Sequence, residues 1–243
     1  MLDTPSKSID QHRDDLSSAL RLAVHFELHE GICNHFSVQV STNPELYLIN
    51  PYGTHWSQLT PDRLLLIDGD GVILEGDGEV EQSAFNIHVQ GHRANPRHVA
   101  ILHTHMPYST ALTMIENGRL EMAHQTALRY WGRLAYEDFY GGLAHSSEAG
   151  QEVVAKQAED KSADVIFLAH HGIVVGGPDV ATAFDDLYYL ERACQQQVLA
   201  MSTGKPLKLI PDNICGHTAG QFQENLVHYA NVHLEALKAA YLS

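Results

Sequence analysis

Cysteine and basic side chains are both scarce in this sequence. Its 243 residues include three cysteines, Cys33, Cys194 and Cys215. An odd number at such wide spacing supports neither a disulfide framework nor a CxxC metal site, so we expect reduced thiols. Lysine and arginine together number 15 against 30 acidic residues, which gives a formal charge of −15. This charge opposes binding to nucleic acid and to anionic lipid.

Long apolar runs and linkers are absent as well. The longest purely aliphatic stretch runs from Leu64 to Ile67, whereas a transmembrane helix needs ~20 apolar residues. Residues 1–10 are polar and contain no apolar signal core. No repeat or Pro/Ser-rich linker divides the chain. We therefore expect a cytoplasmic protein without a nucleic acid or membrane partner, with a flexible tail over residues 1–9 and a single domain over residues 10–243.

The spacing of apolar residues predicts helices that alternate with strands. Apolar residues recur every four positions between Leu16 and Leu28, which predicts a helix over residues 10–30 with Gly31 as its C-cap. A mixture of this kind indicates an α/β fold in which helices cover the faces of a mixed sheet. Strands are predicted at residues 36–40, 46–49, 64–67, 72–74, 99–103 and 165–168, the last continuing through 173–175, and further helices at 79–94, from 107, and at 146–159, 179–201 and 220–242.

Histidine is abundant, with 17 residues. His103 and His105 stand two residues apart at the end of a predicted strand, so both side chains project to the same side and can chelate one ion. His170 and His171 follow another apolar strand, and because adjacent side chains point in opposite directions, one of them is expected to join. Three histidines with an open position are typical of catalytic zinc, and the same set would hold manganese or ferrous iron. The alternative is a set of hydrogen-bonded histidines at strand ends.

Four runs of the sequence are distinctive: VAILHTHMPYSTAL at 99–112, GRLAYEDF at 132–139, HHG at 170–172 and DLYYLERAC at 186–194. Together they resemble the class II aldolase/adducin family over about residues 16–206. This resemblance implies a three-layer α/β/α sandwich on a largely antiparallel sheet and a homo-oligomer, commonly a tetramer, with sites at subunit borders. It also implies that a divalent metal, foremost Zn²⁺, binds His103, His105 and His171.

The chain departs from the sugar-phosphate aldolases of that family in two places. Those enzymes carry a catalytic glutamate 19 residues before the first metal-binding histidine, and the corresponding residue here is Ala84. Tyr52 stands where they have a small threonine beside the substrate phosphate, and a bulky phenol would crowd phosphoryl oxygens. Both differences disfavour a phosphosugar substrate. At these positions the chain resembles the adducin-like branch of the family, which includes structural domains of the cytoskeleton.

Two residues near Ala84 are candidates to replace the missing acid/base group. His88 lies one helical turn later, and Glu81 is the nearest carboxylate. Each also has a structural interpretation, His88 as a helix-capping histidine and Glu81 as part of a charged first turn that complements the helix dipole.

Three further residues match positions that line the family's substrate site. The resemblance implies that Asn34, Gly53 and Ser83 bind substrate, although an Asx-type turn would explain Asn34 equally well.

These observations favour an enzyme, a divalent-metal-dependent lyase that acts on a small non-phosphorylated hydroxy acid, oxo acid or carbonyl compound. Aldol cleavage and decarboxylation are both open, and decarboxylation is favoured because it needs no base at a substrate hydroxyl. One alternative is a ferrous-iron oxygenase that uses the same three histidines. The other is a non-catalytic interaction domain like that of adducin.

Overall fold

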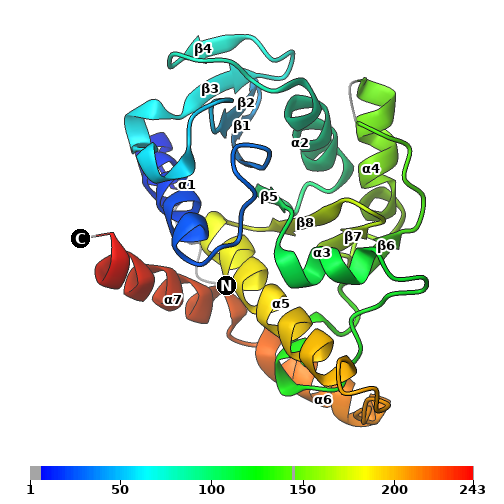
Figure 1. Ribbon diagram of the computed structural model, residues 1–243. Helices are drawn as coiled ribbons and strands as arrows, with labels where there is room; N and C mark the ends of the chain where they lie inside the picture. Colours follow the sequence, from blue (N-terminus) through cyan, green and yellow to red (C-terminus); the bar gives the residue numbers. More distant parts are fainter. Residues whose placement is uncertain (1–6, 144–145, 243) are drawn as a thin grey trace.

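The computed structural model describes residues 7–143 and 146–242. Within them the strands form one eight-stranded sheet in the order β4-β3-β2-β1-β5-β8-β7-β6 (Figure 1). Neighbouring strands are antiparallel except β6 and β7, which are parallel. The expected mixed, largely antiparallel sheet is confirmed. The strands are β1 (His35–Thr42), β2 (Glu45–Ile49), β3 (Leu65–Asp68), β4 (Ile73–Glu75), β5 (Ala100–Thr104), β6 (Leu134–Glu137), β7 (Val165–Leu168) and β8 (Gly172–Gly177).

Helices cover both faces of this sheet and complete three layers. On one face, Ile87 of α2 and Val154 of α4 share an apolar cluster with Ile101 of β5. On the other face, the main core joins α1 and α5 to the sheet. No helix of the described residues is long and apolar enough to cross a membrane. The α-helices are α1 (Ile9–His25), α2 (Gln82–Ala94), α3 (Pro107–Thr113), α4 (Ser147–Glu159), α5 (Val180–Met201), α6 (Asp212–Gln223) and α7 (Leu226–Tyr241), with short 3-10 turns at Trp56–Gln58, Pro61–Arg63 and Gln125–Tyr130.

The first helix begins and ends earlier than the sequence pattern predicts. Ser8 caps α1 in a capping box with Gln11, so residues 7–9 do not form a loose tail. Residues 1–6 of the expected tail lie outside the described residues. At its other end, Glu27 adopts φ 57° and the amide of Leu28 donates to Ala23 at 2.8 Å. This is a Schellman ending built on a non-glycine residue, and Gly31 does not cap the helix.

Two other predictions of chain direction are wrong. The segment after β7 does not continue as one strand, because the chain reverses at His170, where φ is 56°, and β8 returns antiparallel to β7. The predicted C-terminal helix over residues 220–242 is instead divided into α6 and α7, with Asn225 at the start of α7. The pattern also missed β6, a half-buried strand of four residues.

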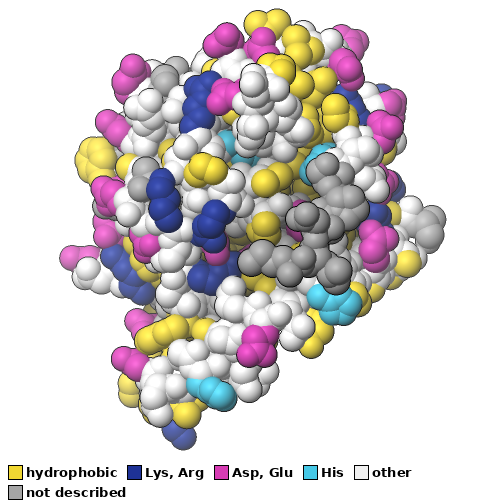
Figure 2. Space-filling model, turned by 180° about the vertical axis from the view of Figure 1, so that it is seen from behind, with side chains coloured by type: hydrophobic (Ala, Val, Ile, Leu, Met, Phe, Trp, Pro, Cys, Tyr) yellow, Lys and Arg dark blue, Asp and Glu magenta, His cyan; other side chains and the backbone are white. Residues whose placement is uncertain are grey.

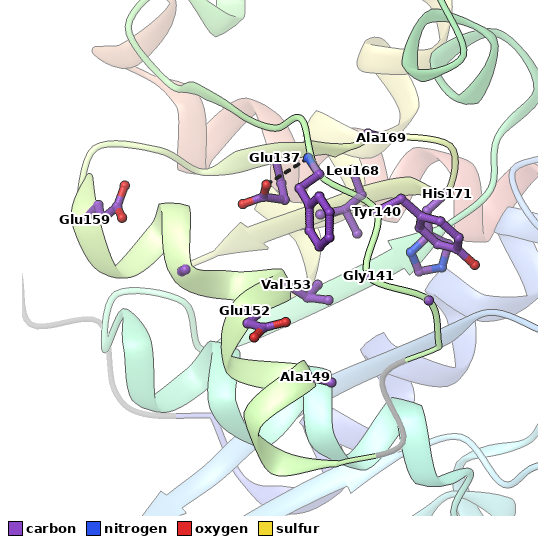
Figure 3. Close-up of a pocket in the computed structure, with 13 residues that line it drawn as sticks. Glu137, Tyr140, Gly141, Ala149, Glu152, Val153, Glu159, Leu168, Ala169 and His171 are labelled. Atoms are coloured by element: carbon purple, nitrogen blue, oxygen red, sulfur yellow. Dashed lines mark hydrogen bonds between the residues drawn. The ribbon is translucent and has the colours of Figure 1, made fainter.

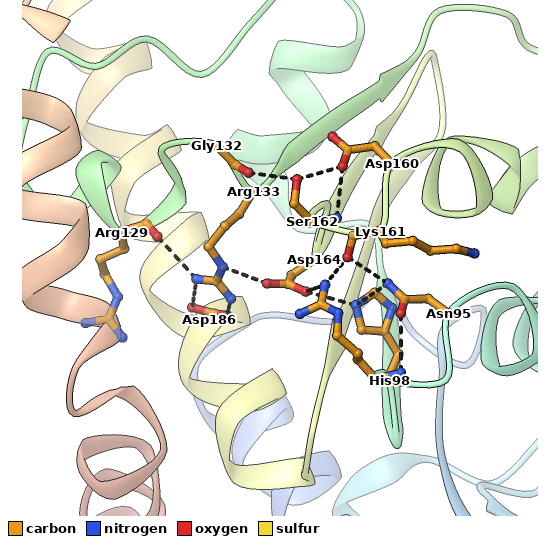
Figure 4. Close-up of polar contacts among 11 residues, drawn as sticks. Asn95, His98, Arg129, Gly132, Arg133, Asp160, Lys161, Ser162, Asp164 and Asp186 are labelled. Carbon is orange, nitrogen blue, oxygen red and sulfur yellow. Dashed lines mark hydrogen bonds and ion pairs between the residues drawn. The ribbon is translucent and has the colours of Figure 1, made fainter.

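A buried network of ion pairs ties the sheet to α5 (Figure 4). Arg133, just before β6, donates to Asp164 at 2.7 Å and to Asp186 of α5 at 2.5 Å. Asp164 also pairs with His98 at 3.0 Å. Asp186 is completely buried, so loss of Arg133 would leave a carboxylate without its compensating charge in a region that excludes water.

Replacing Arg133 by alanine is therefore expected to lower the free energy of unfolding by about 3–5 kcal/mol. Urea denaturation followed by circular dichroism measures this loss. Arg63→Ala is the matched control, because Arg63 is exposed and makes one long contact, 3.4 Å to the Gln58 carbonyl. A loss below about 1 kcal/mol for Arg133→Ala, the range of an exposed ion pair, would contradict the assigned role.

Candidate metal centre

Three histidines converge where β5 and the β7–β8 turn meet. His103 lies on β5, His105 follows it, and His171 lies in the turn before β8. One ring nitrogen from each lies within 4.8 Å of the others, and the ring centroids are 4.7–4.9 Å apart. His170, the neighbouring histidine, lies outside this group, with its ring 6.4 Å from that of Tyr140. The structure thus brings together the three residues that the sequence singled out.

Close backbone approach at Gly172 makes this convergence feasible. A Cβ atom there would lie 2.5 Å from the Thr104 carbonyl oxygen and 2.7 Å from Cδ2 of His105. Any larger residue would push the β7–β8 turn away from the end of β5. The glycine that follows His171 therefore sets the distance between the two halves of the site.

Hydrogen bonds fix which nitrogens of the rings carry protons. Nδ1 of His103 lies 3.0 Å from the Ile173 carbonyl oxygen, and Nδ1 of His105 lies 2.7 Å from the Glu30 carboxylate. Because both oxygens only accept, both Nδ1 atoms donate, and each Nε2 of a neutral ring keeps its lone pair. Yet these two Nε2 atoms face each other at 3.1 Å. Two lone pairs at that distance repel unless a proton or a cation lies between them.

Burial disfavours a proton on His103 and on His171. Burial, with charge from the neighbouring histidines, holds the pKa of His103 well below its usual range. Burial and the charge of His105 lower the pKa of His171 to about 4. The group therefore fits a divalent cation, which neutral imidazoles bind readily.

Glu30 is a functional candidate that the sequence did not reveal. It lies in the loop after α1, 75 residues from the histidine it contacts. Its amide donates to Oδ1 of Asn34 at 2.6 Å, so the buried Asn34 holds the loop that carries Glu30. Nδ2 of Asn34 is buried and has no hydrogen-bond partner among the described residues. An exposed acidic residue in a loop gives no local signal of such a role.

The residues expected near Ala84 have other partners. Glu81 is the N-cap of α2 and accepts from the Ala84 amide at 2.8 Å and from the Ser83 hydroxyl. Burial raises the pKa of Glu81, but these hydrogen bonds outweigh it and leave the pKa lowered. Gly53 occupies an exposed turn at φ 78°, and no contact among the described residues joins it to the three histidines.

His88 belongs to a second group of buried histidines beside the first. Its Nε2 lies 2.7 Å from Nδ1 of His35, and its Nδ1 lies 2.5 Å from the Ser37 hydroxyl. The same hydroxyl lies 2.8 Å from Nε2 of His92. His88 thus stands in the middle of α2 and does not cap it. It reaches the metal-site candidates through His35, whose ring lies 4.7 Å from that of His103.

A cavity of about 290 Å³ opens beside His171 (Figure 3). Tyr140 lies next to His171 at one end, and Val153 and Leu168 contribute to the apolar part of the wall. Among the described residues that line it there are three glutamates and no lysine or arginine. Such a wall repels phosphate and carboxylate groups alike, so it suits an uncharged or apolar part of a substrate. The carboxylates belong to Glu137, Glu152 and Glu159.

Comparison with known proteins agrees with this architecture. Residues 14–198 match the family model described as Class II Aldolase and Adducin N-terminal domain. Decarboxylase NovR of Streptomyces niveus is 30% identical over 86% of this chain and 77% of that protein. Alpha-adducin of Rattus norvegicus is 31% identical over 82% of this chain and 27% of that protein. An aldolase II superfamily protein from Pseudomonas syringae superimposes with a TM-score of 0.86 at 28% identity, covering 98% of this chain and 96% of the other.

Acid should destabilise the fold through His92. Burial is the main cause that lowers the pKa of His92, to about 4 from 6.5. Between these values the unfolded chain binds the proton that the folded chain excludes, so stability is present above about pH 6.5 and is lost as the pH falls. The loss attributable to His92 is about 2 kcal/mol between pH 7 and pH 4.5.

Urea denaturation of the metal-free protein at both pH values measures this loss of stability. In His92→Gln we expect the free energies of unfolding at pH 7 and pH 4.5 to differ by about 2 kcal/mol less than in wild type. His217→Gln, at an exposed histidine, should keep the wild-type difference. If the free energy of unfolding fell by the same amount with pH in wild type and in His92→Gln, His92 would not be the group that destabilises the fold in acid.

Proposed function

Because this chain belongs to the class II aldolase and adducin family, we propose that it is a lyase that depends on a divalent metal ion. His103, His105 and His171 hold the ion, with Zn²⁺ as the foremost candidate and Mn²⁺ or Fe²⁺ as the other ions that imidazole suits. The substrate is a small non-phosphorylated hydroxy acid, oxo acid or carbonyl compound. The reaction breaks a carbon–carbon bond.

One observation carries this proposal: the Nε2 atoms of His103 and His105 face each other at 3.1 Å with both lone pairs unshared. A bound divalent cation would act there as a Lewis acid towards the charge that develops on substrate oxygens during bond cleavage. The chain's own contribution is to hold the rings. Ile173 and Glu30 fix their tautomers, and Gly172 sets the position of the third ring.

The environment of α2 favours decarboxylation over aldol cleavage. Ala84 is buried and offers no carboxylate, and Glu81 is committed to the start of the helix. Retro-aldol cleavage must remove a proton from a hydroxyl, whereas loss of carbon dioxide needs no base there. The similarity to decarboxylase NovR supports the same choice.

We also propose a homo-oligomer, most simply the tetramer that the family resemblance implies. Exposed apolar side chains gather near the end of α5 and on α6, among them Leu199, Leu209 and Ile214. Figure 2 shows hydrophobic side chains at this lower end of the molecule. A second copy of the chain would remove them from water.

Metal content tests the central assignment. We expect purified wild type, dialysed against trace Zn²⁺, to retain about one ion per chain. His171→Ala should reduce that content several-fold because one of three ligands is lost. His170→Asn is the matched control, since it removes the adjacent imidazole and keeps a side chain that tolerates positive φ. Elemental analysis decides, and equal metal content in wild type and His171→Ala would refute the site.

The carboxylate behind His105 should tune affinity without adding a ligand. Glu30→Gln is expected to weaken Zn²⁺ binding by about 10- to 100-fold, because a less basic acceptor holds His105. Glu27→Gln, an exposed change in the same loop, should leave the affinity unchanged. Competition titration with a chromophoric chelator measures both. Equal affinities would show that Glu30 does not support His105.

A second function, an adducin-like interaction domain, is favoured by the alanine at position 84 and by the similarity to alpha-adducin. Carbon dioxide release from a panel of oxo and hydroxy acids separates the two functions. A lyase loses turnover in His103→Ala while the circular dichroism spectrum stays unchanged. A panel without turnover in the metal-loaded protein favours the interaction domain, and oxygen uptake by the iron-loaded protein favours an oxygenase.

A further inference from the structure

A continuous line of hydrogen bonds runs from the interior of α2 to the edge of the metal-site candidates. His92, Ser37, His88 and His35 follow one another in contact, and all four are buried. His35 and Ser37 are two residues apart on β1, so both side chains face α2. His35 is also the cross-strand partner of His103.

The direction of every hydrogen bond in this line follows from its far end. Nδ1 of His92 lies 2.7 Å from the His98 carbonyl oxygen, which can only accept, so this nitrogen carries a proton. Burial keeps His92 neutral, in agreement with the lowering of its pKa to about 4. Its Nε2 therefore accepts the single proton of the Ser37 hydroxyl.

The two remaining hydrogen bonds, those nearer the metal-site candidates, have fixed directions as well. Since the Ser37 proton is committed to His92, the Ser37 oxygen accepts from Nδ1 of His88 at 2.5 Å. Nε2 of His88 then has a lone pair and accepts from Nδ1 of His35 at 2.7 Å. A neutral His35 with its proton on Nδ1 keeps a lone pair on Nε2. Among the described residues, the side-chain hydrogen bond of His35 is the one from Nδ1 to His88, and 5% of the surface of His35 is exposed.

We propose that His92, Ser37 and His88 are positioning residues that hold His35 in the Nδ1–H tautomer, and that Nε2 of His35 accepts a hydrogen bond from a substrate hydroxyl. Nε2 thereby supplies an acceptor beside His103, on the face of the sheet where Ala84 supplies none. The tautomer line stands on the contacts alone, and only the substrate hydroxyl rests on the proposed function.

A merely space-filling role does not require this arrangement. Apolar side chains would fill the layer between β1 and α2 without the cost of burying polar rings. Here three imidazoles and one hydroxyl all donate their hydrogen bonds in the same direction along the line, and the His98 carbonyl oxygen is the last acceptor. Reversal of any one bond would leave two donors or two acceptors facing each other.

Nitrogen-15 NMR of metal-free, histidine-labelled protein at neutral pH reads the tautomers directly. Each ring is assigned by its single substitution to glutamine. We expect pyrrole-type Nδ1 and pyridine-type Nε2 resonances for His35, His88 and His92. An Nε2–H tautomer at His35 in the wild-type spectrum would by itself overturn the proposal.

Ser37→Ala tests transmission along the line. Without the hydroxyl, Nδ1 of His88 has no acceptor, so we expect its proton to move to Nε2 and the Nε2 resonance of His35 to become pyrrole-type. Ser37→Thr keeps a hydroxyl and should restore the wild-type pattern. Ser57→Ala is the control, since Ser57 contacts the exposed His55 at 2.8 Å and should leave His35 unchanged.

An unchanged His35 tautomer in folded Ser37→Ala would overturn the positioning role. The NMR experiment uses metal-free protein, so its result does not depend on the metal content of His171→Ala. The tautomer of His35 therefore tests the positioning role, and the metal content of His171→Ala tests the metal site.

Discussion

Two nitrogen lone pairs held face to face are the constraint on which the account of this site depends. The Nε2 atoms of His103 and His105 approach to 3.1 Å because the opposite nitrogens are committed to the Ile173 carbonyl and the Glu30 carboxylate. Such an arrangement is unfavourable by itself and becomes favourable around a cation. The carbonyl and the carboxylate behind the rings therefore determine the site as much as the histidines do.

The sheet explains why these groups meet. β5 is antiparallel to both β1 and β8, so the end of β5 adjoins the beginning of each neighbour. Three parts of the site consequently lie at the same end of these strands: His35 at the start of β1, His103 near the end of β5 and the turn before β8. Gly172 allows the turn to approach within contact of His105. Antiparallel topology thus gathers residues that are far apart in the sequence.

Much of this could be predicted from the sequence where the pattern is local. The spacing of His103 and His105 at a strand end, the long helix α5 and the β3–β4 hairpin are all recognisable from nearby residues. The fold class followed from the alternation of elements and from the family resemblance. The hypothesis that His171, and not His170, joins the pair came from that resemblance, and the geometry agrees with it.

What escaped prediction depends on tertiary contacts or on unusual backbone conformations. Glu27 and His170 take positive φ values without being glycine, so neither the end of α1 nor the reversal after β7 carried a sequence signal. Glu30 acts on a residue 75 positions away. The sequence predicts His88 as a base or a helix cap, yet its contacts are with Ser37 and His35, which lie across the layer on β1.

The most direct test of the central claim is X-ray absorption at the zinc edge of the Zn²⁺-loaded protein. We expect a first coordination shell with three imidazole nitrogens at about 2.0–2.1 Å and the remaining position taken by oxygen. A shell with fewer than three imidazoles, or one containing sulfur, would contradict it.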